Sequence, residues 1–376
     1  MPDEVLKYRM AFAAIRGMGI DLAQKLLDVL PDEAAFFAAS GDELQRLLQS
    51  RSKISDSGYR RKLLDMAEEE IRFIRDNGIN VTYFTDPDFP ARLLNAPDAP
   101  ILLYSKGRCD LNRSKVVSIV GTRNASPYGT RLCETIVADL AAAFKDDLIV
   151  VSGLAYGIDI AAHRAALHEG VATVGVLAHG LNTLYPAMHR STANEMVKSG
   201  GALLTDYTSH DRICRANFLA RNRIVAALAD CTIVVESAEK GGAMVTAGIA
   251  SSYNRDVFAL PGRTTDQYSA GCNRLINRNV ASLVTSGDDI IKAMQWEPAP
   301  NVGGTARQRE LFPELTDEEE PVYQFLKKHN GDPVHINTIY TTLQIPMSQL
   351  LGLLIDLEFK GLVTALPGNR YSTIST

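Results

Sequence analysis

The 376-residue chain has no excess of positive charge, and its cysteines are few and isolated. It carries 39 Lys and Arg against 44 Asp and Glu, which gives a formal net charge of -5. This balance excludes a uniformly basic nucleic-acid binder, so any contact with phosphate must come from a local cluster of cations and backbone amides. The five cysteines lack the paired spacing of a zinc site or a small disulfide framework. We therefore expect reduced thiols and no bound metal.

Long apolar runs are also missing. No stretch approaches the roughly 18 apolar residues of a membrane-spanning helix, and the first residues do not combine a basic start with an apolar run. We therefore expect no secretion and no membrane insertion, and a cytoplasmic location is predicted. Hydrophobic residues make up 46% of the chain and charged residues 22%, which is typical of a globular protein. Two or three domains are expected at this length.

The hydrophobic pattern divides the chain into parts. Residues 1–80 have helical spacing, which predicts a small helical domain. Within it, Ile15–Ile20 contains two glycines and is similar to the turn of a SAM/helix-hairpin-helix-like domain, although any short turn between helices needs such glycines. A linker is predicted at 299–315. Residues 316–376 show three helical segments and then two short strands, which is the order of a winged helix.

The central part, residues 81–298, alternates strands with helices. A short strand at 81–84 precedes a proline-rich stretch that is predicted to be irregular up to residue 100. Further strands are predicted at 116–120, 148–151, 171–177, 202–205, 232–236, 256–260 and 282–284. This alternation predicts an α/β fold, a Rossmann-like parallel sheet with helices on both faces. Ligands of such sheets bind beyond the carboxyl ends of the strands, so the loops there are the candidates for a site.

The loop after the strand at 116–120 combines a glycine, an arginine and a helix start. It reads Gly121-Thr122-Arg123, and a helix follows Ser126. Glycine allows close approach of the backbone, a helix start offers N–H groups, and arginine adds a planar cation, so the combination suits phosphate. The loop matches neither the Gly-x-Gly-x-x-Gly dinucleotide fingerprint nor a P-loop.

Later loops at the same edge have a similar composition. The second contains Gly153, the third offers Tyr185 with Arg190, and a double glycine that ends at Gly242 precedes another helix. A double glycine before a helix forms either an anion cradle or an ordinary turn. Several such turns at one edge favour a ligand site.

Two histidines, His163 and His168, follow the second loop. Because they are five residues apart, they do not share one face of a helix. Ordinary polar positions on the helix are expected for both, rather than a role as metal ligands or bases.

The densest basic cluster of the central part precedes the strand at 232–236. It contains Arg221 and Arg223 next to Phe218 and Asn222, and two further arginines lie just upstream. A solvated helix face would also explain these arginines. Their density favours a surface that follows a phosphate backbone.

Taken in order, these segments resemble the DprA (Smf) DNA-processing family. The resemblance rests on Gly121-Thr122-Arg123, Ser152–Asp159, Tyr185-Pro186, Phe218–Ile224, Gly242–Ala247 and Ala259–Gly262. It covers the whole central part, and the two flanking domains are similar to extensions found in that family. The resemblance implies a homodimer that binds single-stranded DNA and protects it from nucleases. It also implies that the protein loads the RecA recombinase during natural transformation, the uptake of DNA by competent cells. No cofactor and no catalysis are expected.

The resemblance also implies which residues contact DNA. By position, Arg123 and the segment Phe218–Arg223 resemble the DNA-contacting elements of the family, and Gly242 is close by. A lysine that is common after Tyr-Pro in the family is absent here, so Arg190 is the nearest cation. The predicted DNA-binding residues are Gly121, Thr122, Arg123, Ser126, Gly153, Tyr185, Arg190, Phe218, Arg221, Asn222, Arg223 and Gly242.

Two other functions are weighed against this one. The strand and loop pattern also resembles lysine-decarboxylase-like phosphoribohydrolases, but no carboxylate follows the turn at Gly241–Gly248, so cleavage of a glycosidic bond lacks its general acid or base. A winged helix that reads duplex DNA is the other alternative. From Thr316 onward, four basic residues face seven acidic ones, and Lys360 is the one cation of the expected recognition helix at 347–360. A duplex would repel such a helix, so an accessory or protein-contact role is predicted.

Overall fold

A computed structural model of the chain describes residues 1–48, 53–297, 315–316, 318–329, 333–360, 362–366 and 368–373. The chain forms two compact units, Met1–Ala299 and Pro300–Thr376. The predicted linker at 299–315 lies outside the described residues, except for Leu315. The predicted domain boundaries stay predictions. Among the described residues, no helix has the length and apolar character needed to cross a lipid bilayer.

The first unit begins with a helical region. Its helices are α1 (Asp3–Ala13), α2 (Ile20–Leu27), α3 (Glu33–Ala38), α4 (Gly41–Leu48) and α5 (Ser57–Asn77). Asp56 caps the start of α5 by accepting a hydrogen bond from the N–H of Gly58, and Gly78 ends the helix in the left-handed conformation. Helix α1 packs along α5, and apolar side chains of both join the core that also lies under the sheet. The helical region and the sheet therefore form one compact unit.

A nine-stranded sheet with the order β1-β2-β6-β5-β4-β3-β7-β8-β9 is the centre of this unit. The strands are β1 (Asn80–Tyr83), β2 (Leu102–Gly107), β3 (Lys115–Val120), β4 (Leu148–Ser152), β5 (Ala172–Val176), β6 (Ala202–Thr205), β7 (Cys231–Val234), β8 (Asp256–Ala259) and β9 (Ser282–Leu283). Strands β3 to β9 pair in parallel, which confirms the predicted parallel sheet. Strand β2 is not among the predicted strands, and it pairs antiparallel with both β1 and β6.

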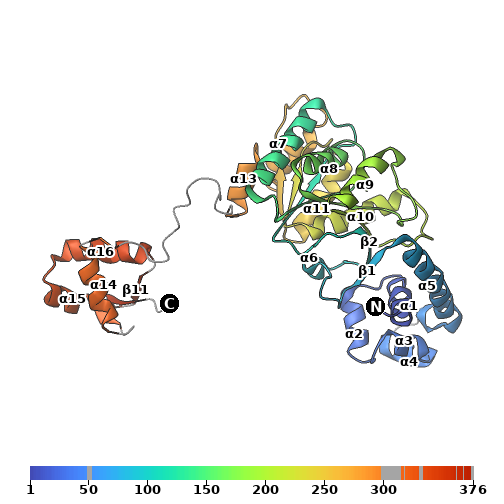
Figure 1. Cartoon of the computed structure of the whole chain (residues 1–376), viewed down its shortest axis with the longest axis horizontal. Helices are drawn as coiled ribbons and strands as arrows, with labels where there is room; N and C mark the ends of the chain where they lie inside the picture. Colours follow the sequence, from blue (N-terminus) through green and yellow to red (C-terminus); the bar gives the residue numbers. More distant parts are fainter. Residues whose placement is uncertain are drawn as a thin grey trace. The chain divides into compact units, whose positions relative to one another are not determined.

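Helices cover both faces of the sheet, as predicted (Figure 1). Along β3, Val117 and Ile119 face one core, and Val116 and Val120 face the other, so the strand is apolar on both sides. Helices α7, α8 and α13 cover the first face, and α10, α11 and α12 cover the second. The helices of this part are α6 (Ala91–Leu94), α7 (Pro127–Phe144), α8 (Ile158–Glu169), α9 (Arg190–Lys198), α10 (Arg215–Leu228), α11 (Gly242–Ser252), α12 (Ala270–Asn277) and α13 (Gly287–Ala293).

The second unit is a winged helix, as predicted. Its elements are α14 (Glu319–Lys327), β10 (Val334–His335), α15 (Ile336–Leu343), α16 (Met347–Phe359), β11 (Val363–Leu366) and β12 (Arg370–Thr373). The three strands pair antiparallel in the order β10-β12-β11, of which β10 was not predicted. Apolar side chains such as Val322, Ile339 and Leu354 form a core of its own.

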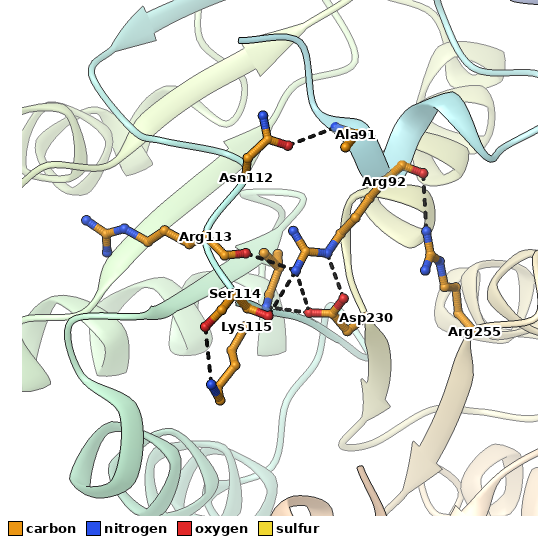
Figure 2. Close-up of polar contacts among 9 residues, drawn as sticks. Ala91, Arg92, Asn112, Arg113, Ser114, Lys115, Asp230 and Arg255 are labelled. Atoms are coloured by element: carbon orange, nitrogen blue, oxygen red, sulfur yellow. Dashed lines mark hydrogen bonds and ion pairs between the residues drawn. The ribbon is translucent and has the colours of Figure 1, made fainter. Parts of the chain in front are cut away.

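A network of hydrogen bonds centred on Arg92 holds α6 against the amino-terminal end of the sheet (Figure 2). The guanidinium of Arg92 donates to both carboxylate oxygens of Asp230, at 2.6 and 2.9 Å, and to the carbonyl groups of Arg113 and Ser114. Asp230 also accepts a hydrogen bond from the N–H of Val116 at the start of β3. The side chain of Asp230, which directly precedes β7, therefore connects α6 with β3.

The Asp230→Asn variant should lose about 2 to 3 kcal/mol of the free energy of unfolding, because the amide cannot accept from both guanidinium nitrogens and leaves the partly buried Arg92 without its counter-charge. Urea denaturation of the purified protein measures this difference. The exposed Asp256, at the start of the neighbouring β8, provides the matched control, and Asp256→Asn should stay within about 0.5 kcal/mol of the wild type. Equal stabilities of the two variants would contradict the role of Asp230.

Candidate functional site

A groove of about 880 Å³ opens at the carboxyl ends of the central strands. Its walls include residues that follow β3, β4 and β7. Strands β3 and β7 are neighbours, but the helices that follow them, α7 and α11, cover opposite faces of the sheet. The groove therefore lies at the topological switch point, where parallel α/β sheets bind their ligands.

The groove brings together most of the residues that the sequence predicts. Lining it are Gly121, Thr122, Arg123, Gly153, Tyr185, Phe218, Arg221, Asn222 and Gly242. Ser126, Arg190 and Arg223 do not line it.

Arg123 and two aromatic rings lie in contact in the groove. The guanidinium carbon of Arg123 lies 5.6 Å from the centre of the Phe218 ring, a cation–π distance. The Phe218 ring in turn contacts the Tyr185 ring at 5.7 Å and an interplanar angle of 69°. Within the described residues, Arg123 forms no ion pair, so its charge is free for an anionic ligand.

A buried histidine holds the backbone of Tyr185 in place. The Nδ1 atom of His179 donates to the carbonyl of Gly180 at 2.9 Å, and its Nε2 accepts from the N–H of Tyr185 at 3.2 Å. These two hydrogen bonds fit the neutral tautomer with its proton on Nδ1, because a carbonyl only accepts and an amide N–H only donates. Burial lowers the pKa of His179, which keeps the ring neutral. Sequence reasoning did not select His179.

The start of α7 is already capped by side chains, which corrects one part of the predicted cradle. Ser126 caps α7 by accepting from the N–H of Gly129 at 3.0 Å. The carboxylate of Glu236 accepts from both the N–H and the hydroxyl of Ser126. A carboxylate at a helix N-terminus satisfies the charge that a phosphate would otherwise neutralise. Ser126 is thus a helix cap outside the groove.

The start of α11 is the open helix end. Gly241 caps it without a side-chain hydrogen bond, and Gly242 is exposed with open space beside its Cα. Lys240 stands just before this turn and also lines the groove. Its position directly before a double glycine was a usable sequence signal that the predicted set omitted.

Helix α10 presents one face to the groove. Arg215, Phe218, Leu219 and Asn222 line it, at the spacing of i, i+3, i+4 and i+7 that places residues on one side of a helix. Arg215 is exposed and forms no ion pair with a described residue. The helical period could have identified this face from the sequence, with Arg215 as its cation.

Arg221 lies beneath the groove, which corrects the prediction that it belongs to an exposed basic surface. Its side chain is buried, and its Nη1 donates to the carbonyl groups of Gly153, at 2.7 Å, and Val176. Burial lowers the pKa of this guanidinium, and the nearby Asp159 carboxylate opposes that shift. Burial likewise raises the pKa of Asp159, with Arg221 opposing. The two charges compensate one another under the floor of the site.

Gly121 and Gly153 are glycines for internal packing rather than for approach of a ligand. A Cβ atom at Gly153 would lie 2.5 Å from Nη2 of Arg221 and 2.6 Å from Oδ2 of Asp159. A Cβ atom at Gly121 would overlap the side chain of Ile158 in α8. The first two loops therefore pack closely against the protein itself, and this changes the predicted reason for both glycines.

Arg223 and Arg190 lie apart from the groove. Arg223 forms an ion pair of 2.5 Å with Asp206, a carboxylate whose pKa is raised by burial, and it faces the helical region. Arg190 is the first residue of α9 and is exposed beside a different cavity. The prediction of a basic surface through Arg223 is thus corrected, because Arg223 does not line the groove and its charge is paired with Asp206.

Exposed aliphatic side chains surround the cations of the groove. Ile213, Leu219 and Val245 line it and are 43%, 48% and 42% exposed. Large apolar side chains that remain in water at a concave site mark a binding surface. The groove therefore offers positive charge and flat or branched apolar surface together.

The two histidines of α8 have separate surroundings. His163 is fully buried, and its Nδ1 lies 2.7 Å from the Thr173 hydroxyl, which itself donates to a carbonyl of β4. The Nδ1 atom of His163 therefore donates its hydrogen to the Thr173 hydroxyl oxygen. Burial lowers the pKa of His163 to about 3. His168 is exposed and pairs with the adjacent Glu169.

Comparison with known proteins places the chain in a family. Residues 80–295 match the model of the DNA recombination-mediator protein A family, and residues 307–369 match the DprA winged helix domain. A putative DNA processing protein DprA of Mycobacterium tuberculosis is 34% identical over 361 residues, which cover 92% of this chain and 89% of that protein. The Smf protein of Escherichia coli is 32% identical, with 74% of each chain covered. The chain belongs to the DNA recombination-mediator protein A family, also called DprA or Smf.

Solved structures of this family share the fold. The crystal structure of DNA processing protein A from Streptococcus pneumoniae superimposes with a TM-score of 0.59 and 29% identity, covering 78% of this chain and 98% of that one. A structure from Helicobacter pylori, described for its single-stranded DNA binding mode, gives a TM-score of 0.52 and 28% identity, covering 58% of this chain and 98% of that one.

Replacement of the buried Arg221 by lysine should lower the free energy of unfolding by about 2 to 4 kcal/mol, because an ammonium cannot reach both carbonyl groups and face Asp159 with the geometry of a guanidinium. Urea denaturation gives the value. Arg215→Lys, on the exposed face of the same helix, is the control and should change stability by less than about 0.5 kcal/mol. A stable Arg221→Lys protein would show that the floor does not depend on this side chain.

Proposed function

We propose that the protein is a single-stranded-DNA-binding recombination mediator that protects incoming DNA and loads RecA during natural transformation. The observation that carries the proposal is the groove, in which Arg123, Arg215 and Lys240 have no ionic partner among the described residues. Three cations without ionic partners that line one groove create a local positive potential, which favours an anionic ligand.

The mixture of groups favours a polymer with both charge and flat apolar faces. The cations suit phosphates, and each phosphate neutralised on a single strand contributes roughly -0.7 to the slope of log affinity against log salt concentration. Phe218 and Tyr185 suit the bases, at about 1 to 3 kcal/mol for each base that stacks on an aromatic ring. An unpaired strand exposes the faces of its bases and a duplex hides them, so the apolar surface favours single-stranded DNA.

Two further observations support binding rather than hydrolysis. The acidic residue among those that line the groove is Asp159, and its carboxylate compensates Arg221 beneath the floor. Glycoside cleavage uses a pair of carboxyl groups around the scissile bond. The relative from Helicobacter pylori, described for its single-stranded DNA binding mode, supports the same conclusion for this chain.

We also propose that the protein acts as a homodimer in the cytoplasm, without a cofactor. Strand β9 lies at one edge of the sheet and carries Leu283, which is 52% exposed. Among the described residues, β9 pairs with β8 on one side only. An exposed apolar side chain on an edge strand is a natural contact for a second copy, so we propose the interface there.

Titration of labelled oligo-dT at several salt concentrations tests the proposal. Arg123→Ala should weaken binding roughly tenfold and reduce the salt slope by about 0.7, since one phosphate contact is lost. The exposed Arg190, outside the groove, supplies the control, and Arg190→Ala should leave both quantities unchanged. Unchanged affinity and slope in Arg123→Ala would remove Arg123 from the site.

The winged helix is proposed to have an accessory or protein-contact role. Lys360, just after α16, forms an ion pair with Glu319 at 2.5 Å, so its charge is already compensated. Leu351 and Ile355 lie on the exposed side of the same helix, where a DNA-reading helix would need polar or basic groups.

A chain that ends at residue 299 should therefore bind oligo-dT within about threefold of the full-length protein, because the groove and its supporting cores lie in the first unit. Gel shifts on both proteins measure this ratio. Complete loss of binding in a truncated chain that still shows cooperative unfolding would overturn the accessory role.

A further inference from the structure

Ser209 connects three parts of the first unit through its polar atoms. Its N–H donates to the Glu70 carboxylate at 2.9 Å, and its hydroxyl donates to the other oxygen of the same carboxylate. Its carbonyl accepts from the side-chain amide of Asn182 at 3.0 Å. Glu70 belongs to α5 of the helical region, whereas Asn182 belongs to the loop after β5. We call this arrangement the Ser209 junction.

The side chain of Glu70 is buried in this junction. Its carboxylate is 3% exposed, although α5 is a long helix with a solvated side. A buried carboxylate is costly unless hydrogen bonds satisfy both of its oxygens, and here Ser209 supplies one donor to each. His210 lies beside both this carboxylate, at 3.6 Å, and that of the preceding residue, Glu69, at 3.8 Å. Glu69 is exposed and forms no hydrogen bond to Ser209 among the described contacts.

One side of the junction leads to the part of the groove lined by α10. The segment between β6 and α10 contains Ser209 and supplies Ile213, and Arg215 follows as the first residue of α10. Local hydrogen bonds keep this segment compact. Asp211 accepts from the N–H and hydroxyl of Thr208, and Asn217 donates to the carbonyl of Arg212.

The other side leads to the part of the groove lined by Tyr185. Asn182 stands three residues before Tyr185, whose ring contacts Phe218. The two segments also pack tightly, because a Cβ atom at Gly180 would overlap the backbone of Thr208 and Ser209. The segment that leads to α10 and the segment that leads to Tyr185 therefore meet at Ser209.

We infer that Glu70 is a positioning residue for nucleic-acid binding, through which the amino-terminal helical region determines the width and alignment of the groove. This inference rests on the proposed function and goes beyond it, because it assigns a role to helices that contribute no side chain to the groove lining. A binding partner or a substitution that moves α5 would therefore alter the affinity for DNA without contacting the DNA.

Titration of labelled oligo-dT against full-length Glu70→Ala, at several salt concentrations, tests the inference. Affinity should fall about tenfold and the salt slope by roughly 0.7, since displacement of Arg215 removes one contact with a phosphate of the strand. Glu69→Ala is the matched control on the same helix and should bind as the wild type does.

Two further measurements separate positioning from loss of folding. Glu70→Gln should restore most of the affinity, because its amide can accept from the N–H of Ser209 and donate to the hydroxyl. Hydrogen exchange in Glu70→Ala should rise in residues 206–214 while the central strands keep their protection. Ser209→Ala, a smaller change, should weaken binding in the same direction.

The possible failures are distinguishable. A wild-type protein that does not bind oligo-dT would contradict the proposed function. Normal binding with the expected Arg123→Ala loss, together with equal affinities and slopes for Glu70→Ala and Glu69→Ala, would overturn the inference alone. Protection lost equally across the whole unit of Glu70→Ala, without rescue by Glu70→Gln, would also overturn it.

Discussion

The buried guanidinium of Arg221 is the interaction on which the groove depends. It joins the carbonyl groups at the ends of β4 and β5 and faces the Asp159 carboxylate at the start of α8. Parallel strands end in carbonyl groups that need donors, and a planar guanidinium can serve several at once. Gly153 must lack a side chain because this group fills the space beside it. The loops above the floor take their positions from this pairing.

Arginine is thus used in two ways within one short helix. Arg221 is buried and compensated, whereas Arg215 is exposed and without an ionic partner among the described residues. The exposed cations line the groove together with aromatic and aliphatic side chains. A chain with a net charge of -5 can therefore present a positive groove, because affinity for a strand depends on the local arrangement of charge.

Contacts outside the groove hold its walls from two directions. Asp230 and Arg92 connect α6 with the amino-terminal ends of β3 and β7, on the side of the sheet away from the groove. Glu70 connects α5 with the segments that form the walls. The helical region shares one hydrophobic core with the sheet, so it is placed to act as a support for the site. This arrangement is the physical basis for the positioning role that we infer for Glu70.

Much of the fold followed from local sequence patterns. The alternation of apolar runs with helical segments predicted the parallel sheet, and the order of the last elements predicted the winged helix, because periodicity reports local conformation directly. Strand β2 was missed because it follows a proline-rich stretch and pairs with strands that are distant in sequence. The glycine loops at one sheet edge also identified the position of the groove.

The chain by itself thus determined the order of its elements, the edge of the sheet that carries the site, and the residues Arg123, Phe218 and Gly242 in the groove. Only the tertiary structure decided which polar groups remain free. Arg221 and Arg223 are two residues apart, so the helix turns them in different directions, and each meets a buried carboxylate from a distant segment. The Glu236 carboxylate likewise caps the start of α7 from a distant segment, whereas the start of α11 has no side-chain cap. Such pairings depend on contacts far apart along the chain, which local patterns do not record.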